Sequence, residues 1–307
     1  MVITRIRGGL GNQMFQYACG RAVSEATNSE LKLDLSWFDK GASYSHDKFF
    51  LDEYNIQKNI ASNKDMKSLF PFGKYGKRFA DSNYYRMPWF FQTVFNFYDE
   101  VAPSHPLIFS SGPVKREFHS ELFNTDGKCY LNGYWVSEKY FNNQIVDISD
   151  QLKDELTLKR DLTGKNLQIA NSIKESTAVS IHDRRRDFLK YGWDLNIDYY
   201  TNAIDRIATE DDNIQLYIFS DDISWIKENL DTEYQTQFIT HNGIEDCVED
   251  IRLMSLCDHN IVSSSSFAWW GAWLNRNENK RVIAPMKWRD CNTHDVDIIP
   301  DGWEIIS

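Results

Sequence analysis

Short apolar runs alternate with amphipathic stretches through the C-terminal half of this 307-residue chain. The runs are mostly rich in β-branched residues, which is typical of buried strands in a parallel sheet. The stretches between them space apolar residues as a helix does, as at Val248, Ile251 and Met254. We expect strands at 177–182, 214–220, 236–240, 259–263 and 280–284. Strand alternating with helix predicts βαβ units and a mainly parallel, doubly wound sheet.

The N-terminal half begins with the same pattern and then loses it. An apolar run at 2–7 is followed by a glycine-rich turn, a helix-like stretch and a second run at 31–35. The chain is then irregular and aromatic until a strand pattern resumes at 129–141. We therefore expect an α/β fold with two Rossmann-type domains that face each other across a cleft. The expected parts are 1–155, 156–285 and a C-terminal tail, 286–307, that packs back on the first domain.

Polar side chains stand where the expected strands of the C-terminal domain end. They are His182 with the arginines behind it, and the residues at 220–222, 240–241 and 263–266. Open α/β sheets bind ligands beyond the carboxyl ends of their strands. Arginine, serine and aspartate at that edge suit a nucleotide that carries phosphates.

The stretch SIHDRRRDF, residues 180–188, carries the most specific chemistry of these strand ends. Arginine offers a planar fork of donors that matches phosphate oxygens, which favours phosphate binding, although a solvated charged surface is the alternative. Four serines at 263–266 begin an aromatic helix, where free N–H groups and the helix dipole attract anions. The alternative there is a capping serine ahead of a buried helix.

The glycine-rich turn GGLGNQMFQYA, residues 8–18, matches neither familiar phosphate loop. A Walker loop needs Lys and Ser or Thr where Gln13 and Met14 stand, and a dinucleotide fingerprint needs a glycine at Met14. Asn12 and Gln13 place two amide side chains at a helix start, from which they can reach into a cleft. A tight turn without a ligand is the alternative.

Composition narrows the class of protein. A net charge of −11 argues against non-specific nucleic-acid binding. Five scattered cysteines without a C-x-x-C pair indicate reduced thiols, and no stretch of about 20 apolar residues is present, so we expect a cytoplasmic protein. The segment 64–90 is basic and aromatic. It suggests peripheral contact with the inner face of an anionic membrane that carries a lipid-linked glycan; the alternative is a solvated loop of the acceptor domain.

These stretches together resemble family-11 glycosyltransferases, in particular bacterial α-1,2-fucosyltransferases. The resemblance is carried by GGLGNQMFQYA, by YLNGYWVSEKYF, by H-x-R-R-x-D, by FSDDISWIKENL and by the long run EDIRLMSLCDHNIVSSSSFAWWGAWLNRNENKRVIAPMKW. They follow one another in family order across nearly the whole chain. The resemblance implies a GT-B-type fold, GDP-β-L-fucose as donor and inverting transfer of L-fucose to O2 of a terminal galactose in a glycan.

The resemblance also implies roles for the residues that match its motifs. Arg184 resembles the arginine at the donor β-phosphate, and His182 the residue beside the guanosine. Asp258 resembles an acidic residue that reads the N–H edge of guanine, with Asp222 as a competing candidate. Asn12 resembles the asparagine that reaches fucose and the acceptor hydroxyl. The remaining expected members are Arg185, Asp187, Ser265, Ser266 and Phe267 on the donor side and Gly11 and Gln13 on the acceptor side.

The sequence departs from the family pattern at a few of these positions. Asp183 stands where a small apolar residue is usual, and Arg186 where glycine is usual. Ser264 and Ala268 replace the common asparagine and serine. These departures bear on fine specificity rather than on the reaction.

Inverting transfer requires in-line attack and stabilisation of the leaving diphosphate. The sequence offers a D-x-D pair only at 295–297, far from any expected strand end, so we expect neither metal nor cofactor and assign the charge stabilisation to Arg184 and the serine helix. Asp34, at the end of an expected strand, is the candidate general base. The alternatives are a transferase that uses another GDP-sugar or makes another linkage, and a sugar-binding module without catalysis.

Overall fold

The computed structural model describes residues 1–40, 48–69, 107–109, 118–209, 213–292 and 297–307. The chain divides into two compact units, Met1–Thr157 and Leu158–Ser307. The division falls two residues after the boundary expected from the sequence, inside the charged stretch that follows Ile148.

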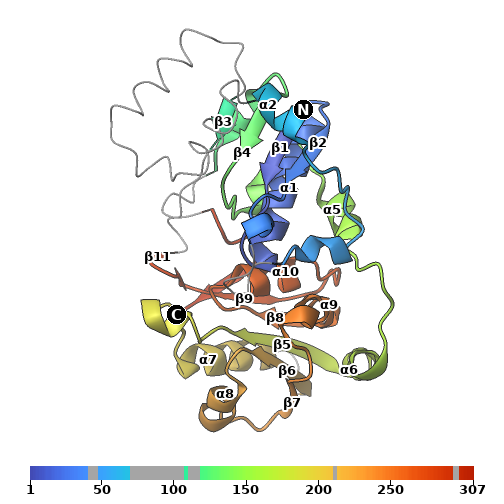
Figure 1. Ribbon diagram of the computed structural model, residues 1–307. Coiled ribbons are helices and arrows are strands. Elements are labelled where there is room, and N and C mark those ends of the chain that lie inside the picture. The colour runs from blue at the N-terminus through green and yellow to red at the C-terminus, as the bar shows by residue number, and fades with distance from the viewer. Residues whose placement is uncertain (41–47, 70–106, 110–117, 210–212, 293–296) are drawn as a thin grey trace. The chain divides into compact units, whose positions relative to one another are not determined.

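The first unit is built on a parallel sheet with the strand order β2-β1-β4-β3 (Figure 1). Its strands are β1 (Val2–Arg5), β2 (Leu31–Asp34), β3 (Leu107–Phe109) and β4 (Cys129–Leu131). Its described helices are α1 (Leu10–Ala26), α2 (Asn63–Leu69) and α5 (Ser149–Glu155). The first strand, the glycine turn and α1 therefore form the βα start that the apolar pattern predicted.

Helix α1 packs unusually close to the sheet, and Gly20 explains how. A Cβ atom at Gly20 would lie 2.9 Å from Cγ2 of Thr4 and 3.0 Å from Cδ1 of Leu31. Real Cβ contacts are almost never that short, so a side chain here would push the helix off the strands. The close fit buries α1 along nearly its whole length.

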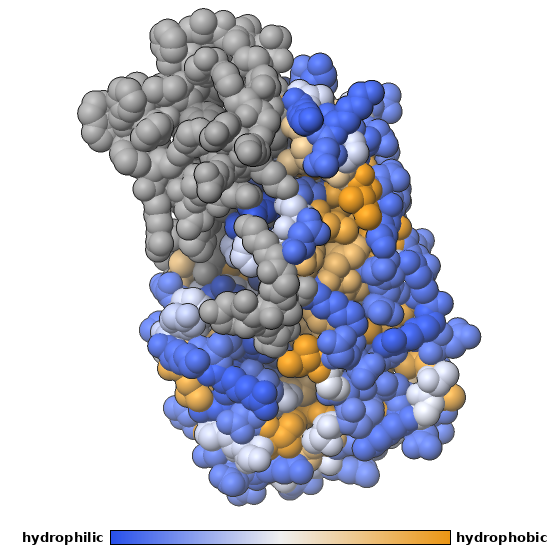
Figure 2. Space-filling view, in the orientation of Figure 1, coloured by the Kyte–Doolittle hydropathy of each residue, from blue (hydrophilic) through white to orange (hydrophobic). Residues whose placement is uncertain are grey.

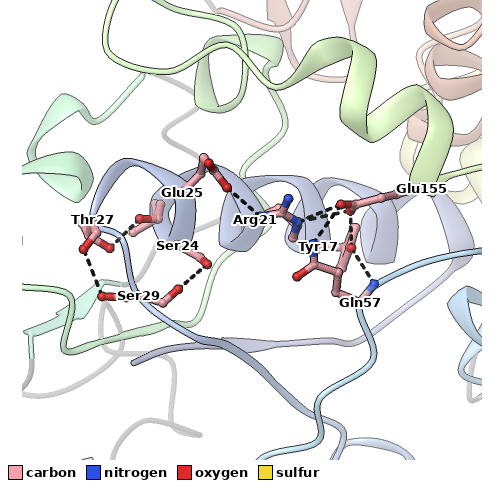
Figure 3. Close-up of polar contacts among 9 residues, drawn as sticks. Tyr17, Arg21, Ser24, Glu25, Thr27, Ser29, Gln57 and Glu155 are labelled. Atoms are coloured by element: carbon pink, nitrogen blue, oxygen red, sulfur yellow. Dashed lines mark hydrogen bonds and ion pairs between the residues drawn. The ribbon is translucent and has the colours of Figure 1, made fainter.

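A polar cluster fixes the other face of α1 to two distant segments (Figure 3). The Tyr17 hydroxyl donates to the Glu155 carboxylate on α5 and accepts the backbone N–H of Gln57 at 2.9 Å. Nε of Arg21 donates to the same carboxylate at 3.1 Å. The buried charges are thus paired and hydrogen-bonded, which is the condition for keeping them in a protein interior.

The second unit contains a larger parallel sheet with the strand order β12-β9-β8-β5-β6-β7 (Figure 1). Its strands are β5 (Thr177–Asp183), β6 (Ile214–Ser220), β7 (Gln235–Ile239), β8 (His259–Ile261), β9 (Val282–Pro285) and β12 (Glu304–Ile306). Its described helices are α6 (Gly164–Lys174), α7 (Ile197–Ala208), α8 (Ile223–Asn229), α9 (Cys247–Leu256) and α10 (Ser266–Trp273). A separate antiparallel pair joins β10 (Lys287–Trp288) to β11 (Cys291–Asn292).

The strand order places a topological switch at the centre of this sheet. From β5 the chain continues outward through β6 to β7, and then returns to β8 on the opposite side of β5. Ligands of doubly wound sheets bind at such a point, outside the carboxyl ends of the strands. We therefore expect a ligand to bind the second unit at the edge of the sheet where β5, β6 and β8 end, and call this edge the ligand edge.

The structure corrects the expectation that residues 286–307 pack back on the first domain. Strand β12 pairs in parallel with β9 and forms the edge of the second sheet. Glu304 accepts a hydrogen bond from Nε of Arg281 at 2.7 Å, and Trp269 Nε1 donates to the carbonyl of Ile298 at 2.8 Å. The free edge of β9 needs a partner for its backbone groups, and the short EII segment supplies it.

Hydrophilic side chains cover most of the described surface seen in Figure 2, with apolar residues scattered among them. No helix within the described ranges is long and apolar enough to cross a bilayer. The basic aromatic segment 64–90 lies outside the described residues from position 70 onward, so its expected membrane contact stays a prediction.

Candidate active site

His182 stands next to the end of β5 and links that strand to the serine turn after β8. Its Nδ1 lies 3.0 Å from Oγ of Ser263, and its ring centroid lies 5.3 Å from that of Phe267. Burial, together with the nearby Arg184 guanidinium, lowers the pKa of His182 to about 3. The imidazole is therefore neutral at physiological pH and acts through hydrogen bonding and packing rather than charge.

Arg184 is held between two carboxylates just beyond the same strand. Its Nη2 lies 2.8 Å from Oδ1 of Asp187, and its Nη1 lies 3.2 Å from Oδ2 of Asp221. Oδ1 of Asp221 also accepts the backbone N–H of Arg185 at 2.8 Å. The Arg184 side chain is 26% exposed. A cation fixed in this way is preorganised for an anion at the sheet edge.

Arg185 turns inward instead of joining Arg184. Its guanidinium carbon lies 3.4 Å from the centroid of the Trp225 ring, and Nη2 lies 3.7 Å from the Asp194 carboxylate. The side chain is 8% exposed, and its Nε and Nη1 have no hydrogen-bond partner within the described parts of the chain. This placement makes Arg185 a brace between the β5 loop and α8 rather than an open donor-binding group.

The serine turn brings the N-terminus of α10 to the same edge. Oγ of Ser265 caps the helix by accepting the backbone N–H of Phe267, and the N–H of Ser265 donates to the carbonyl of Ser263 at 2.7 Å. Ser266 is the first helical residue. Because Phe267 contacts His182, the structure brings the expected set His182, Ser265, Ser266 and Phe267 together.

The glycine turn of the first unit places Asn12 in the first turn of α1. Gly8 has φ +76°, a conformation that favours glycine, and a Cβ built there would lie 3.3 Å from Nδ2 of Asn12. The Asn12 amide thus sits directly over the turn. Gly11 is buried within the helix, and Asn12 is half-buried.

The comparisons with known proteins add to this geometry. Residues 115–307 match the family model described as glycosyl transferase family 11. An alpha-1,2-colitosyltransferase from Escherichia coli is 31% identical over 99% of this chain and 98% of its own length. This chain belongs to glycosyl transferase family 11. The family assignment confirms the resemblance drawn from the sequence motifs.

Two further similarities are more distant. A mouse (Mus musculus) galactoside alpha-(1,2)-fucosyltransferase 2 is 28% identical over 47% of this chain and 44% of its own length. The structure of an Arabidopsis thaliana FUT1 mutant in complex with GDP aligns with this chain at a TM-score of 0.51 and 12% identity. The aligned region covers 92% of this chain and 69% of the Arabidopsis chain. The fold of this family 11 enzyme is α/β and GT-B-like, as expected.

One expected donor residue of the family 11 enzyme, Asp258, lies at the wrong edge of the sheet. It precedes β8, and its carboxylate accepts the backbone N–H of Ala178 near the start of β5 at 2.8 Å. Nδ2 of Asn277 donates to its other oxygen at 3.1 Å. In parallel strands the amino and carboxyl ends lie on opposite edges, so Asp258 is separated from His182 by the length of β5. This placement does not favour the assignment of Asp258 to guanine, which stays a prediction.

The competing candidate, Asp222, lies at the correct edge but is a helix cap. Its Oδ1 accepts the backbone N–H of Trp225 at 3.2 Å, and its own N–H donates to Oγ of Ser220 at 2.9 Å. Capping the N-terminus of α8 accounts for these contacts.

Gln13, which we expected on the acceptor side, makes internal hydrogen bonds instead. Its Nε2 donates to the carbonyls of Gly8 at 2.7 Å and Lys48 at 2.8 Å, and its Oε1 accepts the N–H of Phe50 at 3.0 Å. The side chain is completely buried. An amide with these bonds holds the turn against the 48–50 segment, which favours a structural role over contact with an acceptor sugar.

Asp34 is a buried structural carboxylate rather than an available base. Its Oδ2 accepts the Tyr130 hydroxyl at 2.6 Å, and its Oδ1 accepts the backbone N–H of Ser36 at 3.0 Å. It is 4% exposed. A base must reach the acceptor hydroxyl, and both oxygens of Asp34 already serve β2 and β4.

The sequence reasoning missed Asp250, which lies in a polar cluster after β7. Nδ2 of Asn242 donates to Oδ1 of Asp250 at 2.7 Å, and Asn242 and His241 both contact Oδ1 of Asn166. Burial raises the pKa of Asp250 to about 7. The residues come from the carboxyl end of β7 and the first turns of α6 and α9, which all lie at the ligand edge. An acidic residue in the first turn after a strand end was the available signal.

Proposed function

We propose that this family 11 enzyme transfers L-fucose from GDP-β-L-fucose to O2 of a terminal galactose, with inversion at the anomeric carbon. The observation that carries the proposal is Arg184, fixed between Asp187 and Asp221 beside His182 at the switch point of the second sheet. Its exposed guanidinium is suited to the diphosphate of a nucleotide sugar. The names of the similar mouse and E. coli proteins support the sugar class and the α-1,2 linkage.

In this proposal the donor lies along the carboxyl edge of the second sheet. Arg184 and the N-terminus of α10 meet the diphosphate, and His182 packs beside the nucleoside. Asp250 replaces Asp258 as the group that reads guanine, because a half-buried carboxylate at the ligand edge can accept both N–H groups of that base. Asn12, at the start of α1, meets the acceptor hydroxyl and the transferred sugar. The general base stays unassigned.

The chemistry follows from the charge that develops. As the bond between C1 and the phosphate oxygen breaks, negative charge grows on the β-phosphate while the acceptor oxygen attacks from the opposite face and loses its proton to a base. A fixed guanidinium stabilises that charge more in the transition state than in the bound donor.

The E. coli similarity makes colitose the sharpest alternative donor sugar. Colitose is L-fucose without its 3-hydroxyl group, so the two GDP-sugars differ at one position. Competition among GDP-fucose, GDP-colitose, GDP-mannose and UDP-galactose for transfer to a galactoside panel tests the proposal. We expect GDP-fucose to have the highest kcat/KM. Transfer of another sugar in preference would contradict it, and GDP-independent glycan binding without transfer would favour the sugar-binding module.

GDP should stabilise the folded protein specifically. A ligand that binds only the native state at a hundredfold excess over its Kd adds about 2.7 kcal/mol to the free energy of unfolding. We expect that effect with GDP and a much smaller one with UDP at the same concentration, measured by chemical denaturation. Equal stabilisation by the two nucleotides would rule out a guanine-reading site.

Turnover should not depend on a divalent metal. Within the described residues no three His, Cys, Asp or Glu side chains form a group that could hold one, and the D-x-D pair begins outside them. With Arg184 stabilising the leaving diphosphate, the rate in excess EDTA should stay within a few-fold of the untreated rate. Loss of activity in EDTA that Mg²⁺ or Mn²⁺ restores would overturn this expectation.

A further inference from the structure

We propose that Asp183 is a positioning residue for Arg184, and that it sets the affinity for the nucleotide-sugar diphosphate through Ser220 and Asp221. The inference rests on the donor site proposed above.

Asp183 joins three elements at the buried base of the ligand edge. It is the last residue of β5 and is completely buried. Its Oδ2 accepts the hydroxyl of Ser220, the register partner that ends β6, at 2.9 Å. Its Oδ1 accepts the hydroxyl of Tyr200 on α7 at 2.9 Å. The carboxylate therefore accepts from the buried Tyr200 hydroxyl and from the half-buried Ser220 hydroxyl, and a small apolar side chain would offer neither of them an acceptor.

The Ser220 hydroxyl connects Asp183 to the segment that holds Arg184. Because its proton points to Asp183, its oxygen is oriented to accept the backbone N–H of Asp222 at 2.9 Å. Asp221 lies between the two residues held in this way, and its carboxylate pairs with Arg184 and with the backbone N–H of Arg185. A change at Asp183 should thus move the carboxylate that orients Arg184, the next residue in the chain.

The charge on Asp183 makes its hydrogen bond with Ser220 sensitive to pH. Burial raises its pKa to about 6, while the hydroxyls of Tyr200 and Ser220 and the Arg185 guanidinium favour the charged form and Asp221 disfavours it. Above that pH the carboxylate accepts from Ser220. Below it, the carboxyl group is neutral and one of its oxygens becomes a donor, so the hydrogen bond that it accepts from Ser220 is weakened or reversed.

Stability should respond in the opposite direction to donor binding. The pKa of Asp183 is higher in the folded protein than the ordinary value of about 3.9, so its contribution to stability is fully present below that value. The contribution is lost as the pH rises through about 6. An uncharged Asp183→Asn variant lacks that loss and should be at least as stable as the wild type at pH 7.5. A residue that served the fold alone would not combine retained stability with weakened donor binding.

The test compares GDP-fucose kinetics from pH 5 to 8 in four proteins. They are the wild type, Asp183→Asn, Ser220→Ala and Tyr200→Phe. GDP-fucose is the probe because its phosphates do not titrate in this range, whereas the terminal phosphate of free GDP does, with a pKa near 6. Urea unfolding of each protein at pH 7.5 supplies the structural control.

Protonation of Asp250 should raise the KM for GDP-fucose in all four proteins as the pH falls through about 7. In the wild type we expect a further rise of about tenfold as the pH falls through about 6, which corresponds to the loss of one hydrogen bond to a charged group. Asp183→Asn and Ser220→Ala should show the higher KM at every pH, without a step near pH 6. Their kcat at saturating donor should fall at least as much as KM rises, because Arg184 acts mainly on the transition state. Tyr200→Phe should keep the wild-type KM at pH 8 but move the step to higher pH, because the charged form loses one donor.

The outcomes separate this inference from the proposed function. A wild type that neither binds GDP at pH 8 nor uses GDP-fucose would contradict the donor site itself. If the wild type is active and Asp183→Asn keeps both the wild-type KM and the step near pH 6, the positioning role is wrong. If Asp183→Asn does not fold, Tyr200→Phe supplies the test. A rise in KM that occurs at the wild-type pH in Tyr200→Phe would also contradict the positioning role of Asp183.

Discussion

Arg184→Ala is expected to lower kcat by roughly 10²–10³, or about 3–4 kcal/mol of transition-state stabilisation. The guanidinium lies at the switch point of the second sheet and is held by Asp187 and Asp221, so it is in place before charge develops on the leaving diphosphate. The affinity for GDP should fall much less than kcat, because the stabilised charge is largest in the transition state. Steady-state kinetics and GDP titration on the folded variant measure both quantities.

Two further variants make this result specific. Arg184→Lys should recover only part of the rate, since an ammonium group lacks the planar fork that contacts two oxygens. Arg186→Ala provides the matched control, because that side chain lies in the same loop but is exposed. It should keep nearly the wild-type kcat. If Arg184→Ala retains a near-normal kcat, Arg184 is not catalytic. If the variant loses stability and activity together, the ion pairs of Arg184 with Asp187 and Asp221 stabilise the loop rather than the transition state.

The second large effect is expected at Asp250. Asp250→Asn should weaken GDP binding by roughly 10- to 100-fold, the cost of losing a hydrogen bond to a charged acceptor in a buried site. It should also abolish the preference for GDP over inosine diphosphate, which lacks the 2-amino group of guanine. Calorimetric titration with both nucleotides at pH 8, above the raised pKa of Asp250, measures the change.

The matched control is Asp258→Asn, at the amino edge of the same sheet. Asp258 holds the N–H of Ala178 and the amide of Asn277, so its loss should lower the stability of the fold while leaving the preference for GDP intact. The reverse pattern, with guanine selectivity lost in Asp258→Asn and kept in Asp250→Asn, would restore the assignment made from the sequence.

The apolar pattern predicted the centre of the second sheet closely because β5, β6, β8 and β9 are short, mostly buried runs between polar turns. The expected 177–182 and 214–220 became β5 and β6, within one residue at each end. The same pattern gave their carboxyl ends, and therefore the cluster of His182, Arg184 and the serine turn. A parallel sheet brings strand ends together whatever the separation in sequence, so local signals were sufficient here.

The errors have a common physical origin in contacts that local sequence does not encode. Gln13 is bonded to residues 48 and 50, which lie in a segment without a periodic pattern. Asp258 was assigned to guanine from its resemblance to an acidic residue of the family, but a residue before a parallel strand lies at the opposite edge from one after it. The final strand, β12, has only three residues and is defined by the open edge of β9 rather than by its own apolar pattern.

The most direct test of the central claim is the structure of the product that the purified enzyme forms from GDP-β-L-fucose and a β-galactoside. Its anomeric configuration and linkage can be read by NMR from the coupling constant of the new anomeric proton and from its correlation across the glycosidic bond. We predict α-L-fucose attached to O2 of galactose. A β-linked product, attachment at another hydroxyl, or transfer only from a different GDP-sugar would contradict the account.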